Sequence, residues 1–456
     1  MYYTRNVSIK QNSPLYPYLD RIAHLSLNLY NAGLFRERQL MTSSKKAECD
    51  WYDHEREIRK EAAGVSDLKV PASGVLSYAA LDKLMKRTHN PDYLAEGLPR
   101  QTAQHVLKHV VRDLKSFFEA MKQYKTNPKM FTGKPKLPGY KHKGGTSSFD
   151  ISNQDCAIYQ NKKGSYSAKL PLIRERVSLG KKIPGRLKEV HVCRKHDTYV
   201  ISFVFDDGKG IPAVKEESCR IASIDLGVNN LMAVTNNCGL ECILFNGKPL
   251  KAVNQLYSKK CAKLASAMTK GSDKKLESTK QYRSVCLKRN NRIHDYLLKS
   301  AKLFITWCVE NRIDTVVIGA NAFWKQEVDM GSQNNQTFVQ IPYDQLKRMI
   351  QWQCERNGIR YEEQEESYTS KASFPDRDDI PLYEETDDED EKKEKPVFKG
   401  TRIRRGIYQS WNGTKINADL NGSANILRKK FGEVFVTEPD FSNVRYILHP
   451  DIALNR

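Results

Sequence analysis

Two aspartates in the second half of the chain have the surroundings of metal-binding carboxylates. Asp225 ends an apolar segment, IASID, and Asp419 stands near the start of a helical segment, NADLNGSANIL. Mg²⁺ prefers oxygen ligands, and two such ions held by carboxylates can activate water and steady a leaving oxygen in phosphodiester cleavage. Each aspartate also has an ordinary interpretation. Asp225 could open a turn before Gly227, and Asp419 could be a partner of the helix dipole.

The elements around these aspartates have the order of an RNase H-like fold. Residues 219–248 predict three consecutive strands, and a long charged helical region covers about 251–310. A strand at 315–319, a helix closed by Gly358 and a strand that ends in EEQEE follow. Such a fold places carboxylates at the ends of neighbouring strands and on a late helix. The order therefore predicts an α/β domain with a metal-dependent phosphodiester site.

The first half of the chain predicts a different architecture. The segment YYTRNVSIK alternates like a strand, and a helix is expected from about Tyr18. Residues 100–124 carry apolar side chains at helical spacing, which predicts a helix with a core-facing stripe. Residues 150–207 alternate in short runs and predict an antiparallel β unit with a turn at Lys195–Asp197.

The composition favours a nucleic-acid partner. The 456 residues include 75 Lys and Arg against 54 Asp and Glu, which gives a net charge of +21 and a pI near 9.4. A chain this basic usually meets a polyanion. It has no apolar run long enough to span a bilayer and no secretory signal, so no membrane partner is expected. Ten cysteines without paired spacing suit a reducing compartment, and we expect a cytoplasmic protein, nucleoid-associated when bound to DNA.

The basic charge is concentrated between residues 122 and 145. This stretch has seven lysines, three interleaved aromatic residues and no acid. Lysines neutralise phosphates and aromatic rings stack on bases, so the stretch predicts nucleic-acid contact over the alternative of a solvated basic loop. The candidate contact residues are Lys122, Lys125, Lys129, Lys134, Lys136, Tyr140, Lys141 and Lys143.

Several motifs together resemble one protein family. SIDLGVNNLMAV, SYTSKASF and NADLNGSANIL resemble the first RuvC motif, the YTS segment and the third RuvC motif of TnpB-type (OrfB family) transposon-encoded nucleases. FNGKPLKAVNQLYSKK and FTGKPKLPGYKHK are also similar to that family, so the resemblance covers nearly the whole chain in order. It implies a transposon-encoded, RNA-guided DNA endonuclease related to type V CRISPR effectors. The implied cofactor is Mg²⁺ at a two-metal RuvC site, and the implied partners are a guide RNA and a target DNA duplex, bound by a monomer.

The resemblance also implies a domain layout of α/β plus β-barrel class. Residues 1–10 and 122–215 would form the two parts of a wedge β-barrel, and residues 11–121 an inserted helical recognition domain. Residues 216–456 would form the RNase H-like (RuvC) domain. Within it, the charge-dense segment 384–394 has no apolar residue and predicts a mobile loop.

The chain departs from the family pattern in its cysteines. Many members carry a four-cysteine zinc ribbon before the third RuvC motif, but here no cysteine follows Cys354. Residues 367–418 therefore offer no thiolate ligands, and no structural zinc is expected. Cys238 and Cys242 flank a predicted hairpin turn without a second pair, and we interpret them as small apolar residues.

The second departure concerns a carboxylate. The family's second RuvC glutamate usually stands on the fourth strand, where this chain has Gly319. The alternatives are Glu327, Glu365 and Glu366. In the expected strand order the fifth strand ends roughly 10 Å from Asp225, two strand spacings away, which carboxylates and metals can bridge. Successive strand residues face opposite ways, and we favour Glu366 because it directly precedes the SYTS turn.

The predicted catalytic and metal-binding set is therefore Asp225, Glu366 and Asp419. If all the glutamates of this strand are instead solvated edge residues, two other functions remain. One is a nuclease-inactive, RNA-guided DNA-binding repressor, which the absent glutamate favours and the two aspartates disfavour. The other is an RNA-binding regulatory protein of the transposon, which would need the basic charge but no carboxylates.

Overall fold

The computed structural model describes residues 1–43, 75–93, 95–214, 219–268, 279–320, 341–381, 396–404, 406–434 and 437–454. The chain forms two compact units, Met1–Lys209 and Gly210–Arg456. The predicted loop at 384–394 and the candidate Glu327 lie outside the described residues. None of the helices described carries an apolar stretch that could cross a lipid bilayer.

The first unit contains a four-stranded antiparallel sheet of order β1-β7-β6-β2. Its first strand is the predicted one, since β1 spans Tyr2–Lys10 and pairs along its whole length with β7 (Thr198–Asp206). The β6–β7 hairpin turns at the predicted place, where His196 has a φ of 56°. The other strands of the unit are β2 (Phe149–Ser152), β6 (Arg186–Lys195), and a separate sheet of β3 (Ala157–Gln160), β4 (Tyr166–Lys169) and β5 (Arg176–Gly180).

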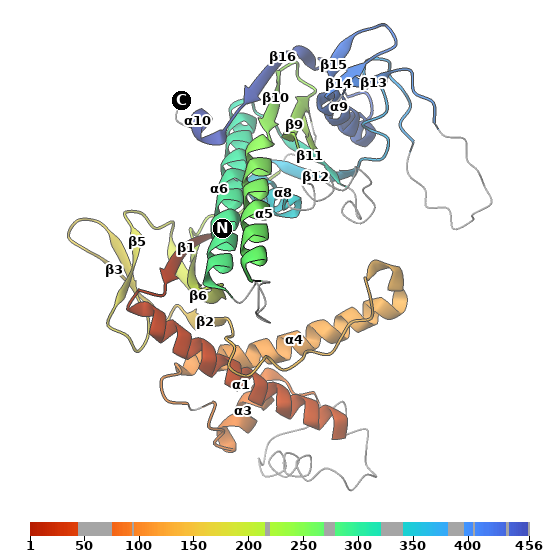
Figure 1. The fold of residues 1–456 in the computed structure, drawn as a ribbon. Helices are drawn as coiled ribbons and strands as arrows, with labels where there is room; N and C mark the ends of the chain where they lie inside the picture. The colour runs from red at the N-terminus through yellow and green to blue at the C-terminus, as the bar shows by residue number, and fades with distance from the viewer. Residues whose placement is uncertain are drawn as a thin grey trace. The chain divides into compact units, whose positions relative to one another are not determined.

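Three helices complete the first unit: α1 (Leu15–Ser43), α3 (Tyr78–Arg87) and α4 (Arg100–Thr126), followed by the 3₁₀ turn η1 (Pro128–Met130). Helix α4 packs against α1 and β2 (Figure 1). The predicted apolar stripe of α4 is buried from Val106 to Leu114. Beyond that point the prediction fails, because Phe118 is exposed. The stripe therefore serves the core only over the first half of the helix.

The second unit is built on a six-stranded sheet of order β12-β11-β8-β9-β10-β16. Strands β8 (Ile221–Leu226), β9 (Asn230–Asn236) and β10 (Glu241–Asn246) form the predicted antiparallel meander. Strand β11 (Thr315–Ala320) is parallel to both β8 and β12 (Arg360–Glu365). Strand β16 (Asp440–Ile447) is parallel to β10 and was not predicted. The fourth and fifth strands thus lie beside the first in the expected order.

Helices cover both faces of this sheet (Figure 1). On one face lie α6 (Lys280–Glu310) and α8 (Tyr343–Asn357), and α5 (Lys248–Met268) and α10 (Pro450–Leu454) pack against α6. Helix α8 ends as predicted, with Gly358 in the left-handed conformation at φ 67°. On the other face lies α9 (Ala418–Phe431), next to a small sheet of β13 (Thr401–Arg404), β14 (Ile407–Gln409) and β15 (Lys415–Asn417).

Candidate active site

Asp225 lies near the end of β8 on the face of the sheet that α9 covers. Alternation along the strand places Ser223 on the same face, where its hydroxyl donates to the backbone carbonyl of Ser423 in α9 at 2.8 Å. Helix and strand come very close here. A Cβ atom on Gly422 would stand 2.8 Å from Oδ2 of Asp225, so the absence of a side chain makes room for the carboxylate. Asp225 is partly exposed, and its carboxylate lies against the helix backbone.

Asp419 lies in the first turn of α9. The Asn417 side chain caps this helix by accepting hydrogen bonds from the backbone amides of Asp419 and Leu420, at 2.9 and 3.2 Å. The two oxygens of Asp419 have different partners. The Asn230 amide donates to Oδ2 at 2.8 Å, and the Arg402 guanidinium lies 3.2 Å from Oδ1. The carboxylate is therefore oriented by groups from two other elements, which a helix-dipole role does not require.

Glu366 directly follows β12, and its carboxylate reaches over Gly319 of β11. A Cβ atom on Gly319 would stand 2.5 Å from Oε2 of Glu366 and 2.7 Å from Cδ1 of Ile426. Both distances are shorter than real Cβ contacts, so a side chain at this position would force the carboxylate out of the place it occupies. The strand position that lacks a glutamate is thus the position that makes room for Glu366.

The neighbouring Glu365 has different contacts. Its carboxylate forms an ion pair with Lys429 at 2.6 Å and accepts a hydrogen bond from the Ser367 backbone amide at 2.5 Å. Lys429 is almost fully buried, with a side chain 2% exposed. Burial alone would raise the pKa of Glu365, but the hydrogen bonds from Lys429 and Ser367 outweigh it and lower that pKa. Its negative charge is therefore already matched within the protein.

The electrostatics of Asp225 show crowding by like charges. Burial raises the pKa of Asp225 well above its ordinary value, and the negative charges of Glu366 and Asp419 raise it further. The Arg402 guanidinium opposes this shift. Because these interactions depend on proximity, they place Glu366 and Asp419 within electrostatic range of Asp225.

Glu366 is perturbed in the same direction. Burial raises its pKa to about 7. The positive charges of Lys347 and Lys429 lower that pKa and the charge of Glu365 raises it, but burial dominates. Buried carboxylates with raised pKa values are a common feature of functional sites.

The donor set fits a hard divalent cation. Three carboxylates supply only oxygen ligands, as Mg²⁺ prefers, and a cation between them would relieve the repulsion that raises the pKa of Asp225. Gly319 and Gly422 keep side chains out of the space next to two of the carboxylates. The residues that would hold the ion are Asp225, Glu366 and Asp419.

Sequence reasoning missed two residues of the site, Asn230 and Arg402. Asn230 is the last residue of the GVNN segment and opens β9, so its closeness to Asp225 in the chain was a usable signal. Arg402 comes from β13, a short exposed strand whose pairing with β14 the sequence did not predict. No local pattern around Arg402 pointed to Asp419.

The predicted nucleic-acid contact residues lie in the first unit, and most of them are available to solvent. The side chain of Lys129 lies outside the described residues. Lys141 differs from the others, since its Nζ lies 2.5 Å from the Ser147 hydroxyl and 3.8 Å from the centre of the Tyr30 ring. Burial also lowers the pKa of Lys141. The exposed members of the set are Lys122, Lys125, Lys134, Lys136, Tyr140 and Lys143.

Two family models match the chain across the second unit and the end of the first. Residues 201–325 match OrfB_IS605, described as a probable transposase, and residues 343–426 match the TNB domain of Cas12f1-like proteins. A TnpB-like protein, ORF457, of Acidianus two-tailed virus is 25% identical over 232 residues. Parts of the chain are thus similar to the TnpB-like OrfB family and to Cas12f1-like proteins. The two matched segments contain all three predicted carboxylates, with Asp225 in the first and Glu366 and Asp419 in the second.

The matched relatives differ in how much of this chain they cover. The aligned residues of the viral protein are 50% of this chain and 45% of the relative, so the chain spans less than half of that relative's length. Among solved structures, a Cas12f1–sgRNA–target DNA complex has a TM-score of 0.47 at 12% identity and covers 94% of this chain and 99% of that one. The mini-RNA-guided endonuclease CRISPR-Cas_phi3 has a TM-score of 0.44 at 10% identity, with 97% and 93% covered.

Proposed function

We propose that this protein is a transposon-encoded, RNA-guided DNA endonuclease that cleaves target DNA beside a short recognition motif. The observation that carries the proposal is that Glu366 and Asp419 lie within electrostatic range of Asp225, whose carboxylate lies against α9. The sheet order, with two parallel strands beside the first strand of a meander, supports an RNase H-like (RuvC) domain. The partial matches to the OrfB model and to a TnpB-like protein support the same activity.

In this proposal each side chain has a specific role. Asp225, Glu366 and Asp419 supply the oxygen ligands for Mg²⁺, which when bound would activate water and steady the leaving oxygen. Asn230 orients the Asp419 carboxylate by its 2.8 Å hydrogen bond. Arg402 adds a positive charge beside the carboxylates and is half-exposed, so it can also meet a phosphate of the substrate.

The proposed partners are a guide RNA and a target DNA duplex. Base pairing with the guide would read most of the target sequence, and the exposed lysines of residues 122–143 would contact phosphates without reading sequence. The pairing of β1 with β7 supports a wedge domain made of residues 1–10 and 122–215, with residues 11–121 inserted as the recognition domain. Residues 216–456 would be the RuvC domain of a cytoplasmic monomer.

A plasmid-cleavage assay with the cognate guide RNA tests the proposal. We expect wild-type protein to cleave the target plasmid with Mg²⁺ and not to cleave it in EDTA. Asp225→Asn and Asp419→Asn should each lower the cleavage rate by more than about 100-fold. Loss of a residue that only hydrogen-bonds to a metal ligand costs about 10- to 100-fold, and these variants would lose a ligand itself. Target binding should be retained in both variants. Asp440→Asn, at an exposed position of β16, is the matched control and should cut normally.

The same assay distinguishes the two other functions. Wild-type protein that binds target DNA with Mg²⁺ present but never cuts it would be a repressor. Protein that binds RNA but no guide-directed target would be a regulatory RNA-binding protein. Either result would contradict the endonuclease proposal.

A further inference from the structure

The first unit contains a second group of side chains of the types that ligate metals, on the facing sides of α4 and the sheet. His105 and His109 are four residues apart and so lie on one face of α4. Asp150 of β2 pairs in register with His191 of β6, and Glu189 lies two residues before His191 on the same face of that strand. Five histidine and carboxylate side chains therefore lie together where the helix covers the sheet.

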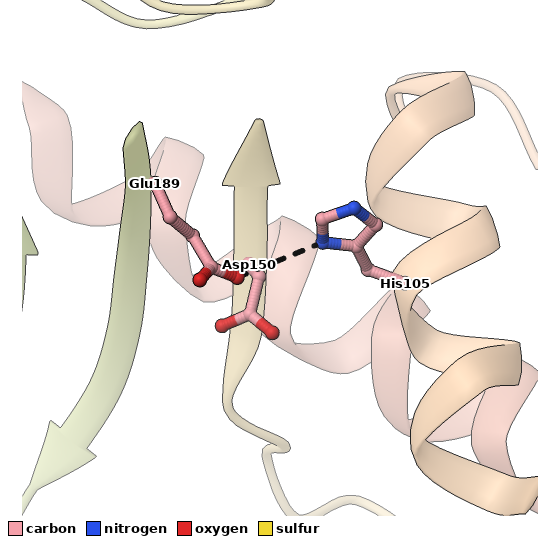
Figure 2. A group of neighbouring side chains, drawn as sticks. All are labelled: His105, Asp150 and Glu189. Carbon is pink, nitrogen blue, oxygen red and sulfur yellow. Dashed lines mark ion pairs between the residues drawn. The ribbon is translucent and has the colours of Figure 1, made fainter. Parts of the chain in front are cut away.

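Three of these residues are close enough to share one ion. A ring nitrogen of His105 and carboxylate oxygens of Asp150 and Glu189 all lie within 4.8 Å of one another. The three side chains point toward the same space from three separate elements (Figure 2). Asp150 is buried, with 6% of its surface exposed.

The spacing of His105 and Glu189 suggests a bridging ion. Nδ1 of His105 and Oε1 of Glu189 are 3.9 Å apart, which is too long for a hydrogen bond. Two ligands of one Zn²⁺ ion, each at about 2.0–2.2 Å, lie roughly 3–4 Å from each other. The two ligand atoms of His105 and Glu189 are thus already at a separation that fits one ion bound between them.

Asp150 also has the outer partners that metal ligands usually have. Nε2 of His109 lies 2.7 Å from one carboxylate oxygen and Nδ1 of His191 lies 2.5 Å from the other. Each oxygen keeps a lone pair for another ligand contact. These two histidines already balance the charge of Asp150. The presence of His105 and Glu189 beside it therefore needs another explanation.

We propose that His105, Asp150 and Glu189 bind a divalent transition-metal ion of the Zn²⁺ type, with His109 and His191 orienting Asp150. The imidazole ligand favours such an ion over Mg²⁺, which prefers oxygen ligands. The ion would join α4 to β2 and β6 within the first unit. The expectation of no structural zinc rested on the absence of cysteines after Cys354. It does not apply to this site, because the three proposed ligands are a histidine and two carboxylates.

The test uses the full chain in an Asp225→Asn/Asp419→Asn background, which removes competing ligands in the second unit. The protein is stripped with EDTA, dialysed against Zn²⁺ and assayed for bound metal and melting temperature. We expect about one retained equivalent and a higher melting temperature. His105→Gln/Glu189→Gln should lose both effects, and His109→Ala should weaken binding by about 10- to 100-fold. His142→Gln, at an exposed histidine, is the control and should bind normally.

Two results would overturn the proposal. One is a parent protein that retains no Zn²⁺ after dialysis, and the other is equal retention by His105→Gln/Glu189→Gln. Circular dichroism checks that each variant is folded. If the double variant fails to fold, Glu189→Gln alone decides the question, because the Glu189 side chain is 46% exposed and its loss leaves the core intact.

Discussion

The two groups of acidic side chains, around Asp150 in the first unit and around Asp225 in the second, differ in how their charges are balanced. Burial alone would raise the pKa of Asp150, but hydrogen bonds from His109 and His191 outweigh it and hold that pKa below its ordinary range. Around Asp225 the negative charges of Glu366 and Asp419 raise its pKa. The charge of Asp150 is therefore balanced by two histidines of the protein, whereas Asp225 has like charges as neighbours.

The largest expected effect is a difference in cleavage rate between substitutions of two adjacent glutamates near Asp225. Glu366→Gln should reduce cleavage at least about 100-fold, because it removes an oxygen ligand, whereas Glu365→Gln should stay within about 10-fold of wild type. The reason is that Lys429 already neutralises Glu365. The measurement is the single-turnover cleavage rate at saturating Mg²⁺. Full activity in Glu366→Gln would refute the assignment.

Stability in the absence of metal should move in opposite directions in the two groups. Asp150→Asn should lower the free energy of unfolding by roughly 3 kcal/mol, because it breaks a buried charged network. Glu366→Gln should raise it by about 1 kcal/mol, because it removes a charge from a crowded buried site. Denaturant titrations in EDTA measure both values. Destabilisation by Glu366→Gln would contradict the contrast between the groups.

A smaller effect should appear in the pH dependence of Mg²⁺ binding. The pKa of Glu366 rises from 4.5 to about 7 in the folded protein. Between these values the folded state holds a proton that the unfolded chain releases, so metal-free stability falls as the pH rises. Mg²⁺ needs the deprotonated carboxylate, so the gain in melting temperature with Mg²⁺ should be larger at pH 8 than at pH 6. Glu366→Gln should remove most of this difference.

The sequence predicted the sheet around Asp225 well, because most of its strands are apolar, short turns join β8, β9 and β10, and the order of elements is that of an RNase H-like fold. The choice of Glu366 at the end of β12 came from its place directly before the SYTS turn and stays a prediction. What the sequence could not predict was the closeness of Glu366 to Gly319, since contacts between parallel strands depend on register. Arg402 was missed for the same reason, because it reaches Asp419 from a short hairpin.

The Asp150 group shows a similar limit in the first unit. The spacing of His105 and His109 is visible in the sequence as two histidines on one helix face. Their partners on β2 and β6 are more than 35 residues further along the chain, and only strand register brings them together. Lys141 was chosen for its charge among neighbouring lysines, but its ammonium group packs against Tyr30 and Ser147. Composition alone does not reveal which lysine of a basic stretch is used inside the fold.

The short distance between position 319 and Glu366 links what the two positions can hold. A Cβ atom at 319 would stand 2.5 Å from Oε2, so a side chain there would force the end of the Glu366 side chain to shift. A glutamate moved from the fourth strand to the fifth would fit most easily where the old position holds a residue without a side chain. Among relatives, we expect a glycine at the first position to accompany a glutamate at the second, so a search for the proposed carboxylate should inspect both strands.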